Sequence, residues 1–355
     1  MRIALVFLLL AGLVWPSAVF AQPFAYVTNF LDDTVSVIDT VNNTVVQTIA
    51  VGANPIGVAV NPAGTRAYVT NMGDNSVSVI NTASNTVIST VTVGIFPQGI
   101  AVSPAGDRVY IANVGDDTVS VVSTVTNTLA DKFAVGNNPV GIAINPLATR
   151  VYVTNNGDDT VSVIETETNT VISTIPVGNY PVGITLNPAG TRAFVMNTGD
   201  DTVSVIRTST NTVLDAIAVG VFPHGVAVHP AGSFVYVTNN GSDTVSVINT
   251  ASGSVVNTIS VGIAPAGIAI NPQGTKVFVA NSESDTVSVI DTATNTVVTD
   301  ISVGDQPTAF SKFIGPVEID PLNIPTLSDW GMVILSLLMA GLALWVVRKK
   351  RRVRA

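Results

Sequence analysis

The chain is poor in the residue types that most often carry out chemistry. It has no cysteine and only two histidines in 355 residues, which excludes disulfides, thiol nucleophiles, cysteine-ligated metals and Cys-x-x-Cys-His haem attachment. Its three tryptophans, Trp15, Trp330 and Trp345, lie near the two ends of the chain. The long central part therefore lacks the largest aromatic anchor found at protein interfaces.

Positive charge is also scarce. The formal net charge is −9, but Arg2 and the six basic residues of 348–354 account for seven of the 15 Lys and Arg. The part between them has 8 Lys and Arg against 24 Asp and Glu, a net charge of −16. Such a domain repels nucleic acids and anionic membrane surfaces, so no nucleic-acid partner is expected.

The central part instead repeats a unit of 42 residues seven times. Each copy has an aromatic residue and, farther along, a Val-Gly-x-x-Pro segment. The aromatic residues are Tyr26, Tyr68, Tyr110, Tyr152, Phe194, Tyr236 and Phe278, and the prolines are Pro55, Pro97, Pro139, Pro181, Pro223, Pro265 and Pro307. Short apolar runs separated by Gly, Pro, Asn and Asp at this period are typical of one four-stranded propeller blade per repeat. We therefore predict an all-β, seven-bladed β-propeller.

One copy shows the expected blade. The apolar run 57–60 suits an innermost strand that is buried on both faces, and the turn Asn61-Pro62-Ala63-Gly64 follows it. Strands over 67–70 and 76–80 come next, joined by an acidic hairpin. The outermost strand, 87–93, mixes Ser and Thr with Val and Ile, as expected at a solvated edge.

The ends of the repeat array predict that the ring closes through both chain ends. The first copy starts at its second strand, and the missing inner strand reappears after the seventh copy as Pro307 to Phe313. One blade would then contain both ends of the array. Lys312 departs from the pattern, so the register of the last two residues is left open. The other copies have an aliphatic residue there: Val60, Val102, Ile144, Leu186, Val228 and Ile270.

Both termini carry export signals. Residues 1–21 combine Arg2, an apolar run and a small-residue cleavage box, which predicts a signal peptide for the Sec machinery. Residues 332–347 are uncharged and predict one transmembrane helix, and the basic cluster 348–352 would remain in the cytoplasm. The expected domains are the propeller over 22–315, a linker over 316–323 and a C-terminal signal over 324–355.

A further pattern precedes the predicted membrane helix. Ile324, Pro325, Thr326 and Leu327, followed by Trp330 and Gly331, resemble the IPTL-type C-terminal sorting signal of Gram-negative bacteria. The resemblance implies cleavage near the motif by an exosortase-type membrane peptidase. The protein would pass from the inner membrane to the periplasm, outer envelope or cell surface. A plain membrane anchor is the alternative, but it would need neither Ile-Pro-Thr-Leu nor Trp-Gly.

The repeats themselves resemble the YVTN β-propeller repeats of bacterial and archaeal cell-surface proteins. Tyr-Val-Thr-Asn begins at Tyr26, Tyr68, Tyr152 and Tyr236, and the other three copies keep the Asn. The resemblance covers residues 24 to about 314. It implies the propeller fold strongly and the function weakly, because propellers also serve as enzyme scaffolds.

The variable position after each repeat proline is expected to surround the mouth of the central channel. Its seven occupants are the candidate ligand contacts: Ile56, Gln98, Val140, Val182, His224, Ala266 and Thr308. A mostly apolar ring with one histidine is not a metal cage. The second histidine, His229, replaces the Asn or Ser of a turn. No catalytic, metal-binding or cofactor-binding residue is therefore predicted.

Acidic hairpins are expected on the same face as the Val-Gly-x-x-Pro segments. Their central residues are Asp32-Asp33, Asp74-Asn75, Asp116-Asp117, Asp158-Asp159, Asp200-Asp201, Ser242-Asp243 and Ser284-Asp285. Hard cations such as Ca²⁺ take oxygen ligands, but paired Asp is also ordinary turn chemistry. Because no Asp-x-Asp-x-Asp loop occurs, no cofactor is assigned, and Ca²⁺ at this face is kept as an alternative.

Two classes of function remain. The favoured hypothesis is a monomeric, exported, non-catalytic propeller that acts as a structural module or binds a protein or glycan ligand. The alternative is an enzyme scaffold of the lactonase or quinone-dependent dehydrogenase type that uses the channel. A lactonase-like metal site would need clustered polar ligands, whereas the mouth offers only His224 and Gln98.

Overall fold

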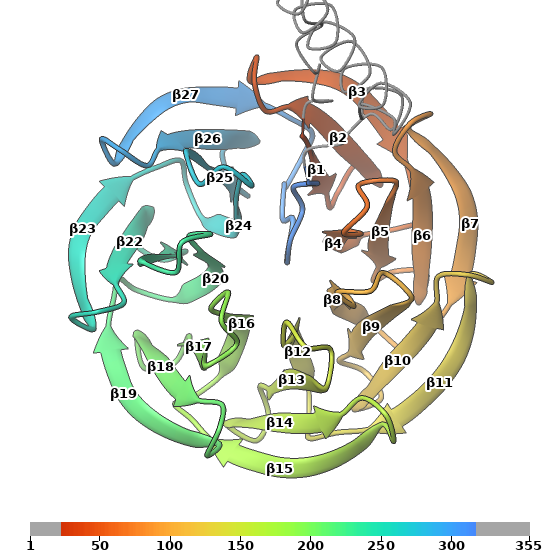
Figure 1. The fold of residues 1–355 in the computed structure, drawn as a ribbon. Helices are drawn as coiled ribbons and strands as arrows, with labels where there is room; N and C mark the ends of the chain where they lie inside the picture. The colour runs from red at the N-terminus through yellow and green to blue at the C-terminus, as the bar shows by residue number, and fades with distance from the viewer. Residues whose placement is uncertain (1–22, 317–355) are drawn as a thin grey trace, which may run out of the picture. The chain divides into compact units, whose positions relative to one another are not determined.

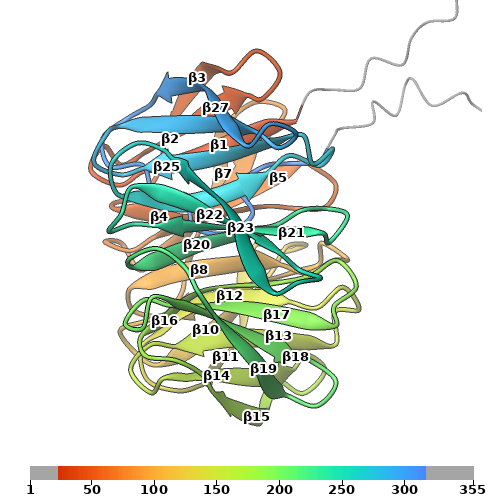
Figure 2. The same ribbon diagram turned by 90° about the vertical axis from the view of Figure 1, so that its left-hand side faces the viewer.

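The computed structural model describes residues 23–316, which form seven antiparallel sheets in a ring around a central channel (Figure 1). In the side view the strands run between the two faces of the disc (Figure 2). The predicted seven-bladed, all-β propeller is thereby confirmed. The predicted signal peptide, membrane helix and sorting motif lie outside the described residues. Within 23–316, no helix has the length and apolarity needed to cross a membrane.

Each blade is a simple meander of neighbouring strands. Blade 1 has β1 (Phe24–Asn29), β2 (Thr34–Asp39) and β3 (Thr44–Ala50), and blade 2 has β4 (Pro55–Val60), β5 (Arg66–Asn71), β6 (Ser76–Asn81) and β7 (Thr86–Thr92). Blade 3 has β8 (Pro97–Val102), β9 (Arg108–Asn113), β10 (Thr118–Ser123) and β11 (Thr128–Ala134), and blade 4 has β12 (Pro139–Ile144), β13 (Arg150–Asn155), β14 (Thr160–Glu165) and β15 (Thr170–Pro176). Blade 5 has β16 (Pro181–Leu186), β17 (Arg192–Asn197), β18 (Thr202–Arg207) and β19 (Thr212–Ala218). Blade 6 has β20 (Pro223–Val228), β21 (Phe234–Asn239), β22 (Thr244–Asn249) and β23 (Ser254–Ser260), and blade 7 has β24 (Pro265–Ile270), β25 (Lys276–Asn281), β26 (Thr286–Asp291) and β27 (Thr296–Ser302).

The blades pack face to face, so their inner strands are buried on both sides. In β5, five consecutive residues after Arg66 are buried, whereas most residues of the outermost strand β7 are exposed or half-buried. Val and Ile fill the positions between neighbouring sheets, where β-branched side chains fit a pleated surface. The seven aromatic residues that mark the repeat are buried in every blade: Tyr26, Tyr68, Tyr110, Tyr152, Phe194, Tyr236 and Phe278.

Side chains of the Tyr-Val-Thr-Asn segment link strands within and between blades. The Thr70 hydroxyl accepts a hydrogen bond from the Gly57 N–H of its own blade and donates one to the Gln98 carbonyl of the next blade, each at 2.8 Å. The Asn71 amide donates to the hydroxyls of Ser76 and Ser78, each at 2.9 Å. The repeated Asn thus bonds side chains of the neighbouring strand in its own blade.

The closing segment, residues 307–315, completes blade 1. It lies inside the ring beside β1 and β4 (dark blue in Figure 1). It makes isolated bridges to β1 and no continuous ladder. The Tyr26 N–H donates to the Phe313 carbonyl at 2.8 Å, and the Gly315 N–H donates to the Phe24 carbonyl at 3.0 Å. The predicted closure through both chain ends is therefore present, with less regular pairing than in the other blades.

The closing segment starts in the predicted register and then shifts by two residues. Pro307 pairs with Asn29 of β1, as the equivalent proline does in the other blades. Farther along, Ala25 pairs with Ile314, where the repeat pattern places Lys312. The structure thus gives the register that the sequence left open: Ile314, and not Lys312, occupies the inner-strand position. Lys312 belongs to a bulge, residues 309–312, that leaves β1 and bonds to β4 on the channel side: the Val58 N–H donates to the Phe310 carbonyl at 2.9 Å, and the Val60 N–H donates to the Lys312 carbonyl at 3.2 Å.

A column of glycines explains why the closing segment cannot stay regular. A Cβ atom at these positions would lie 2.1 to 2.3 Å from a carbonyl oxygen of the next blade: Gly57, Gly99, Gly141, Gly183, Gly225 and Gly267. The closing segment has Ala309 at this position, and its φ is 43°. Because its methyl group cannot approach the next blade in the same way, the chain turns into the channel. Phe313, fully buried, then returns to the core of blade 1.

Candidate functional site

The disc has two chemically different faces. The connection face carries the acidic hairpins and the segments that join one blade to the next, such as Gly52–Asn54. The turn face carries the Asn-Pro turns, such as 61–64, and the basic residues that begin the second strand of five blades: Arg66, Arg108, Arg150, Arg192 and Lys276. Both ends of the described chain, Pro23 and Pro316, lie on the turn face, since Gly315 bonds to Phe24 at that end of β1.

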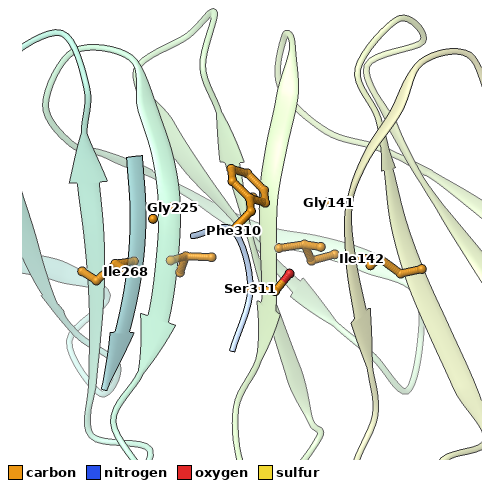
Figure 3. Close-up of a pocket in the computed structure, with 10 residues that line it drawn as sticks. Gly141, Ile142, Gly225, Ile268, Phe310 and Ser311 are labelled. Carbon is orange, nitrogen blue, oxygen red and sulfur yellow. The ribbon is translucent and has the colours of Figure 1, made fainter. Parts of the chain in front are cut away.

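The central channel is filled near the connection face by Phe310 of the bulge. Phe310 clusters with Val140, Val182 and Ile56, and its ring stands edge-on to the His224 imidazole with 4.9 Å between centroids. Figure 3 shows Phe310 between the inner strands, with Ser311 below it. Four of the seven predicted mouth residues therefore surround a side chain of the protein itself.

The other three predicted mouth residues have different surroundings. Ala266 is buried. The Thr308 hydroxyl donates to the Ile56 carbonyl at 3.2 Å, and the Gln98 amide lies 4.0 Å from the Met72 sulfur. The role of the mouth ring as a ligand contact stays a prediction.

His224 is held neutral by its surroundings. Burial lowers the pKa of its imidazole from 6.5 to about 4, although a hydrogen bond with the backbone of Ala266 opposes the shift. Its Nδ1 atom is buried and has no hydrogen-bond partner in the described part of the chain. A neutral imidazole beside Phe310, without a carboxylate to orient it, is a poor general base.

His229 stabilises a turn and its contact with the next blade. Its Nε2 atom lies 3.1 Å from the Gly274 carbonyl of the next blade, and its Nδ1 atom accepts a hydrogen bond from the Ala231 N–H at 3.0 Å. With Nδ1 accepting, Nε2 carries the proton and donates to the carbonyl. The side chain therefore joins two blades at the turn face.

Beneath Phe310 the channel opens into a cavity of about 640 Å³ that reaches the Asn-Pro turns. Its wall is a ring of aliphatic side chains: Val60, Val102, Ile144, Leu186, Val228, Ile270 and Ile314. Lys312 is the one charged residue among the described residues that line it. Sequence reasoning missed this cavity, although the departure of Lys312 from the repeat pattern was a visible signal.

The acidic hairpins serve as clamps between blades. The second central residue of each hairpin accepts a hydrogen bond from the backbone N–H found 21 residues later, just before the next proline. The distances are 2.8 to 3.1 Å for Asp33–Asn54, Asn75–Phe96, Asp117–Asn138, Asp159–Tyr180, Asp201–Phe222, Asp243–Ala264 and Asp285–Gln306. Six of these seven residues are Asp, so one oxygen of each of these carboxylates already accepts a backbone hydrogen bond. Within residues 23–316, no group of three or more His, Asp or Glu is placed to hold a metal ion.

Three of the backbone N–H groups bonded by these hairpins belong to aromatic residues whose side chains are exposed on the connection face. The clamped residues all have φ between 50° and 53°, a conformation that suits Asn or Gly and is unusual for bulky residues. Two blades use Asn there, at Asn54 and Asn138. Phe96, Tyr180 and Phe222 occupy it elsewhere and are 46%, 60% and 52% exposed. Sequence reasoning missed these residues, although their position varies between the repeats.

Family models match three parts of the chain. An IPTL-CTERM motif matches residues 324–354, a YNCE-like β-propeller model matches residues 183–274, and a seven-bladed lactonase β-propeller model matches residues 14–130. A comparison with curated protein sequences found no match. The two propeller models cover parts of the repeat array, in agreement with the observed blades.

Solved structures share the fold at low identity. A chain of Kuenenia stuttgartiensis hydrazine synthase is 20% identical with a TM-score of 0.68, and the alignment covers 80% of this chain and 99% of that one. A protein of unknown function from Desulfotomaculum acetoxidans is 20% identical with a TM-score of 0.71, covering 81% and 99%. A putative 6-phosphogluconolactonase from Bacteroides fragilis is 16% identical with a TM-score of 0.70, covering 83% and 98%.

These likenesses establish the fold and leave the chemistry to the residues of this chain. The match over 324–354 confirms the IPTL-type motif predicted there, and the roles of its individual residues stay a prediction. The chain is a seven-bladed β-propeller repeat protein with a C-terminal IPTL-CTERM motif, which indicates an exported protein of the cell envelope.

Proposed function

We propose that the protein is an exported, envelope-attached, non-catalytic propeller that binds a protein partner through its connection face. The observation that carries the proposal is the exposure of Phe96, Tyr180 and Phe222 at positive φ. Backbone strain from a positive φ is retained in proteins where the side chain has a function. Asn, which two blades have at this position, would adopt the same φ with less strain.

Aliphatic residues on the connection segments favour a protein over a glycan. Ile95 and Val221 precede Phe96 and Phe222 and are 45% and 43% exposed, and Ile263 of the equivalent segment before β24 is 52% exposed. Aliphatic side chains add apolar area to a protein interface, in which Phe and Tyr are also enriched. The surrounding hairpins carry Asp, so the complementary partner has an apolar patch edged by basic residues.

The described chain ends at Pro316 on the turn face, and the proposed binding surface is on the opposite, connection face. We further propose that the protein is exported by the Sec machinery and processed by an exosortase-type peptidase. It would be a monomer in the periplasm, in the outer envelope or at the cell surface.

The test compares variants of the fragment 22–320, which contains the whole closed ring. Phe96, Tyr180 and Phe222 are changed together to Asn, the residue that blades 1 and 3 supply at this position. The control is Leu147→Asn, which removes an apolar side chain that is 80% exposed in a turn-face loop. Photo-crosslinking to envelope extracts and a glycan array measure binding, and circular dichroism checks folding.

Partners that are crosslinked on the connection face should be lost in the triple variant and retained in Leu147→Asn. Equal crosslinking by the triple variant would refute this binding face. Binding to glycans alone would replace the protein partner with a sugar. Purified partners that bind the fragment directly, with basic residues at the crosslinked site, would support the proposal.

The lactonase family match over residues 14–130 favours a second candidate, a hydrolase that uses the channel. The described cavity wall supplies Asn, Thr, Ser and one Lys as polar groups. It presents no carboxylate that could act as general base. Saturable lactone hydrolysis by the fragment, lost in Lys312→Leu, would establish this candidate in place of the non-catalytic one.

A further inference from the structure

The cavity on the turn face has the size and lining of a small-molecule site. Its volume of about 640 Å³ lies within the roughly 300–1,000 Å³ typical of ligand pockets. At about 30 Å³ per water molecule, this is space for on the order of twenty waters. The aliphatic wall offers such waters few hydrogen-bond partners, so displacing them with an apolar group is favourable.

Lys312 breaks the symmetry of this wall. The equivalent residues in six blades are aliphatic, and Ile314 completes their ring. Lys312 is an additional side chain on the bulge 309–312, which inserts two more residues than the irregularity in the other inner strands. Its ammonium group makes no hydrogen bond or ion pair with any residue of 23–316. The packing of the ring therefore gives no reason for a positive charge here.

Lys312 lines the cavity with an exposed side chain, so a ligand in the cavity can reach its ammonium group. The surrounding wall lowers the pKa of that group below its usual value of 10.5. An anion inside the cavity would stabilise the charged form, because an ion pair beside a wall of low dielectric constant is stronger than one in bulk water.

We propose that the cavity binds a small amphiphilic anion, a carboxylate joined to an apolar chain. The carboxylate would pair with Lys312, and the chain would lie against the ring that contains Val102, Leu186 and Val228. Ser311, which follows Phe310 in the chain, adds a hydroxyl group to the lining of the cavity. This site lies on the face opposite the proposed protein-binding surface, so either proposal can fail without the other.

Binding is measured by isothermal titration calorimetry with the fragment 22–320, whose ring forms one compact unit. The probe is sodium dodecanoate below its micellar concentration. Dodecanol tests the chain without the charge, and acetate tests the charge without the chain. We expect one dodecanoate per ring, weaker binding of dodecanol and none of acetate. A wild-type fragment that does not bind dodecanoate would overturn the proposal.

Lys312→Leu removes the charge and keeps an apolar side chain like that of Leu186. It should weaken dodecanoate binding about tenfold or more, as expected for loss of an enclosed ion pair, and leave dodecanol binding unchanged. The matched control Lys132→Leu removes a lysine that pairs with Asp116 at 3.1 Å on an exposed strand, and it should bind normally. Equal affinity of Lys312→Leu and wild type for dodecanoate would refute the role of Lys312.

A second variant tests the cavity independently of the charge. Val102→Phe with Val228→Phe narrows the wall from two blades while Lys312 remains. It should weaken binding of dodecanoate and dodecanol alike. Retained binding of both ligands by a folded double variant would place them outside the cavity and refute the site.

Discussion

The Lys276 ammonium group donates a hydrogen bond to the Thr40 carbonyl at 3.0 Å, although the two residues are 236 positions apart. The same contact occurs between neighbours in the chain, where Arg66 donates to the Thr124 carbonyl at 2.8 Å, 58 residues later. Counting 58 residues onward from Lys276 around a ring of seven 42-residue units returns to Thr40. The junction between the last and first blades is therefore built like the others.

Removal of the closing segment should destabilise the whole ring. A fragment 22–306 lacks Phe310 and Phe313, which are buried in the channel and in the core of blade 1. Loss of buried phenylalanines alone costs about 3 kcal/mol or more each. Thermal unfolding followed by circular dichroism should show a much lower midpoint than for 22–316. Equal midpoints would mean that the closing segment contributes nothing to stability.

The clamp between Asp159 and the Tyr180 N–H, at 2.8 Å, can be tested with two substitutions. Asp159→Ala removes the acceptor and should cost about 1 kcal/mol. Asp159→Asn keeps an acceptor oxygen, as Asn75 does in blade 2, and should cost less. Urea unfolding of both variants measures the difference. A larger loss for Asn than for Ala would contradict the clamp.

The glycine column predicts that Gly141→Ala is poorly tolerated. The added methyl carbon would meet the Val182 carbonyl oxygen at 2.1 Å, so the blades must move apart at a cost of about 1–3 kcal/mol. Gly106→Asn is the control, since an added Cβ there meets only the Pro62 Cδ atom at 3.6 Å and Asn tolerates positive φ. Differential scanning calorimetry should rank Gly141→Ala as the less stable variant.

His224 should make stability depend on pH in one direction. Its pKa is lowered to about 4 in the folded protein, while an unfolded chain protonates near 6.5, so the unfolded state gains the proton first. Stability is thus fully present above about pH 6.5 and falls as the pH decreases toward 4, by at most about 3 kcal/mol. His224→Val, which supplies the residue type of Val140 and Val182, should lack this loss.

The comparison is made by urea unfolding at pH 7 and at pH 4.5, with His229 present in both proteins. The free-energy difference between wild type and His224→Val should shift in favour of the variant at the lower pH. A difference that stays constant between the two values would show that the imidazole is solvated and free to protonate.

Processing of the tail should depend on the sorting motif. Mass spectrometry of protein from the native envelope should find a C-terminus before residue 332. Replacing Pro325-Thr326 with Ala-Ala should leave full-length chain in the inner membrane, because only the motif distinguishes this tail from an ordinary anchor. Recovery of wild-type protein that still contains Trp345 would show that the tail is not cleaved.

The regular part of this molecule could be predicted because each copy of the repeat confirms the others. Aromatic, Gly and Pro residues recur at fixed spacing, and the same burial and turn geometry follow in each blade. The register stayed open at Lys312 because Ala309, one methyl larger than Gly, changes the path of the chain, and the repeat pattern alone does not measure that clash. The cavity depends on seven strands from distant parts of the sequence, so its volume required coordinates.

The acidic face illustrates a different limit. The hairpins and their shared face were predicted, and turn chemistry was recognised as an alternative to Ca²⁺ binding. The hydrogen bond between Asp159 and the Tyr180 N–H was not predicted. A contact between a hairpin and the following connection can be recognised only when the blades are placed side by side. The exposed aromatic residues were overlooked because a Phe or Tyr in a repeat is ordinarily assigned to the core. Tyr152 follows that rule and is buried, whereas Tyr180 is exposed.

The hydrogen bond between Gly315 and Phe24 has a consequence for protein engineering. Because the two ends of the ring are neighbours, a short linker could join them, and new termini could be opened at another Asn-Pro turn. Such a circular permutant would retain every junction between blades, and the bulge with Lys312 would lie in the middle of the chain. The order in which the blades are synthesised is thus separable from the structure that they form.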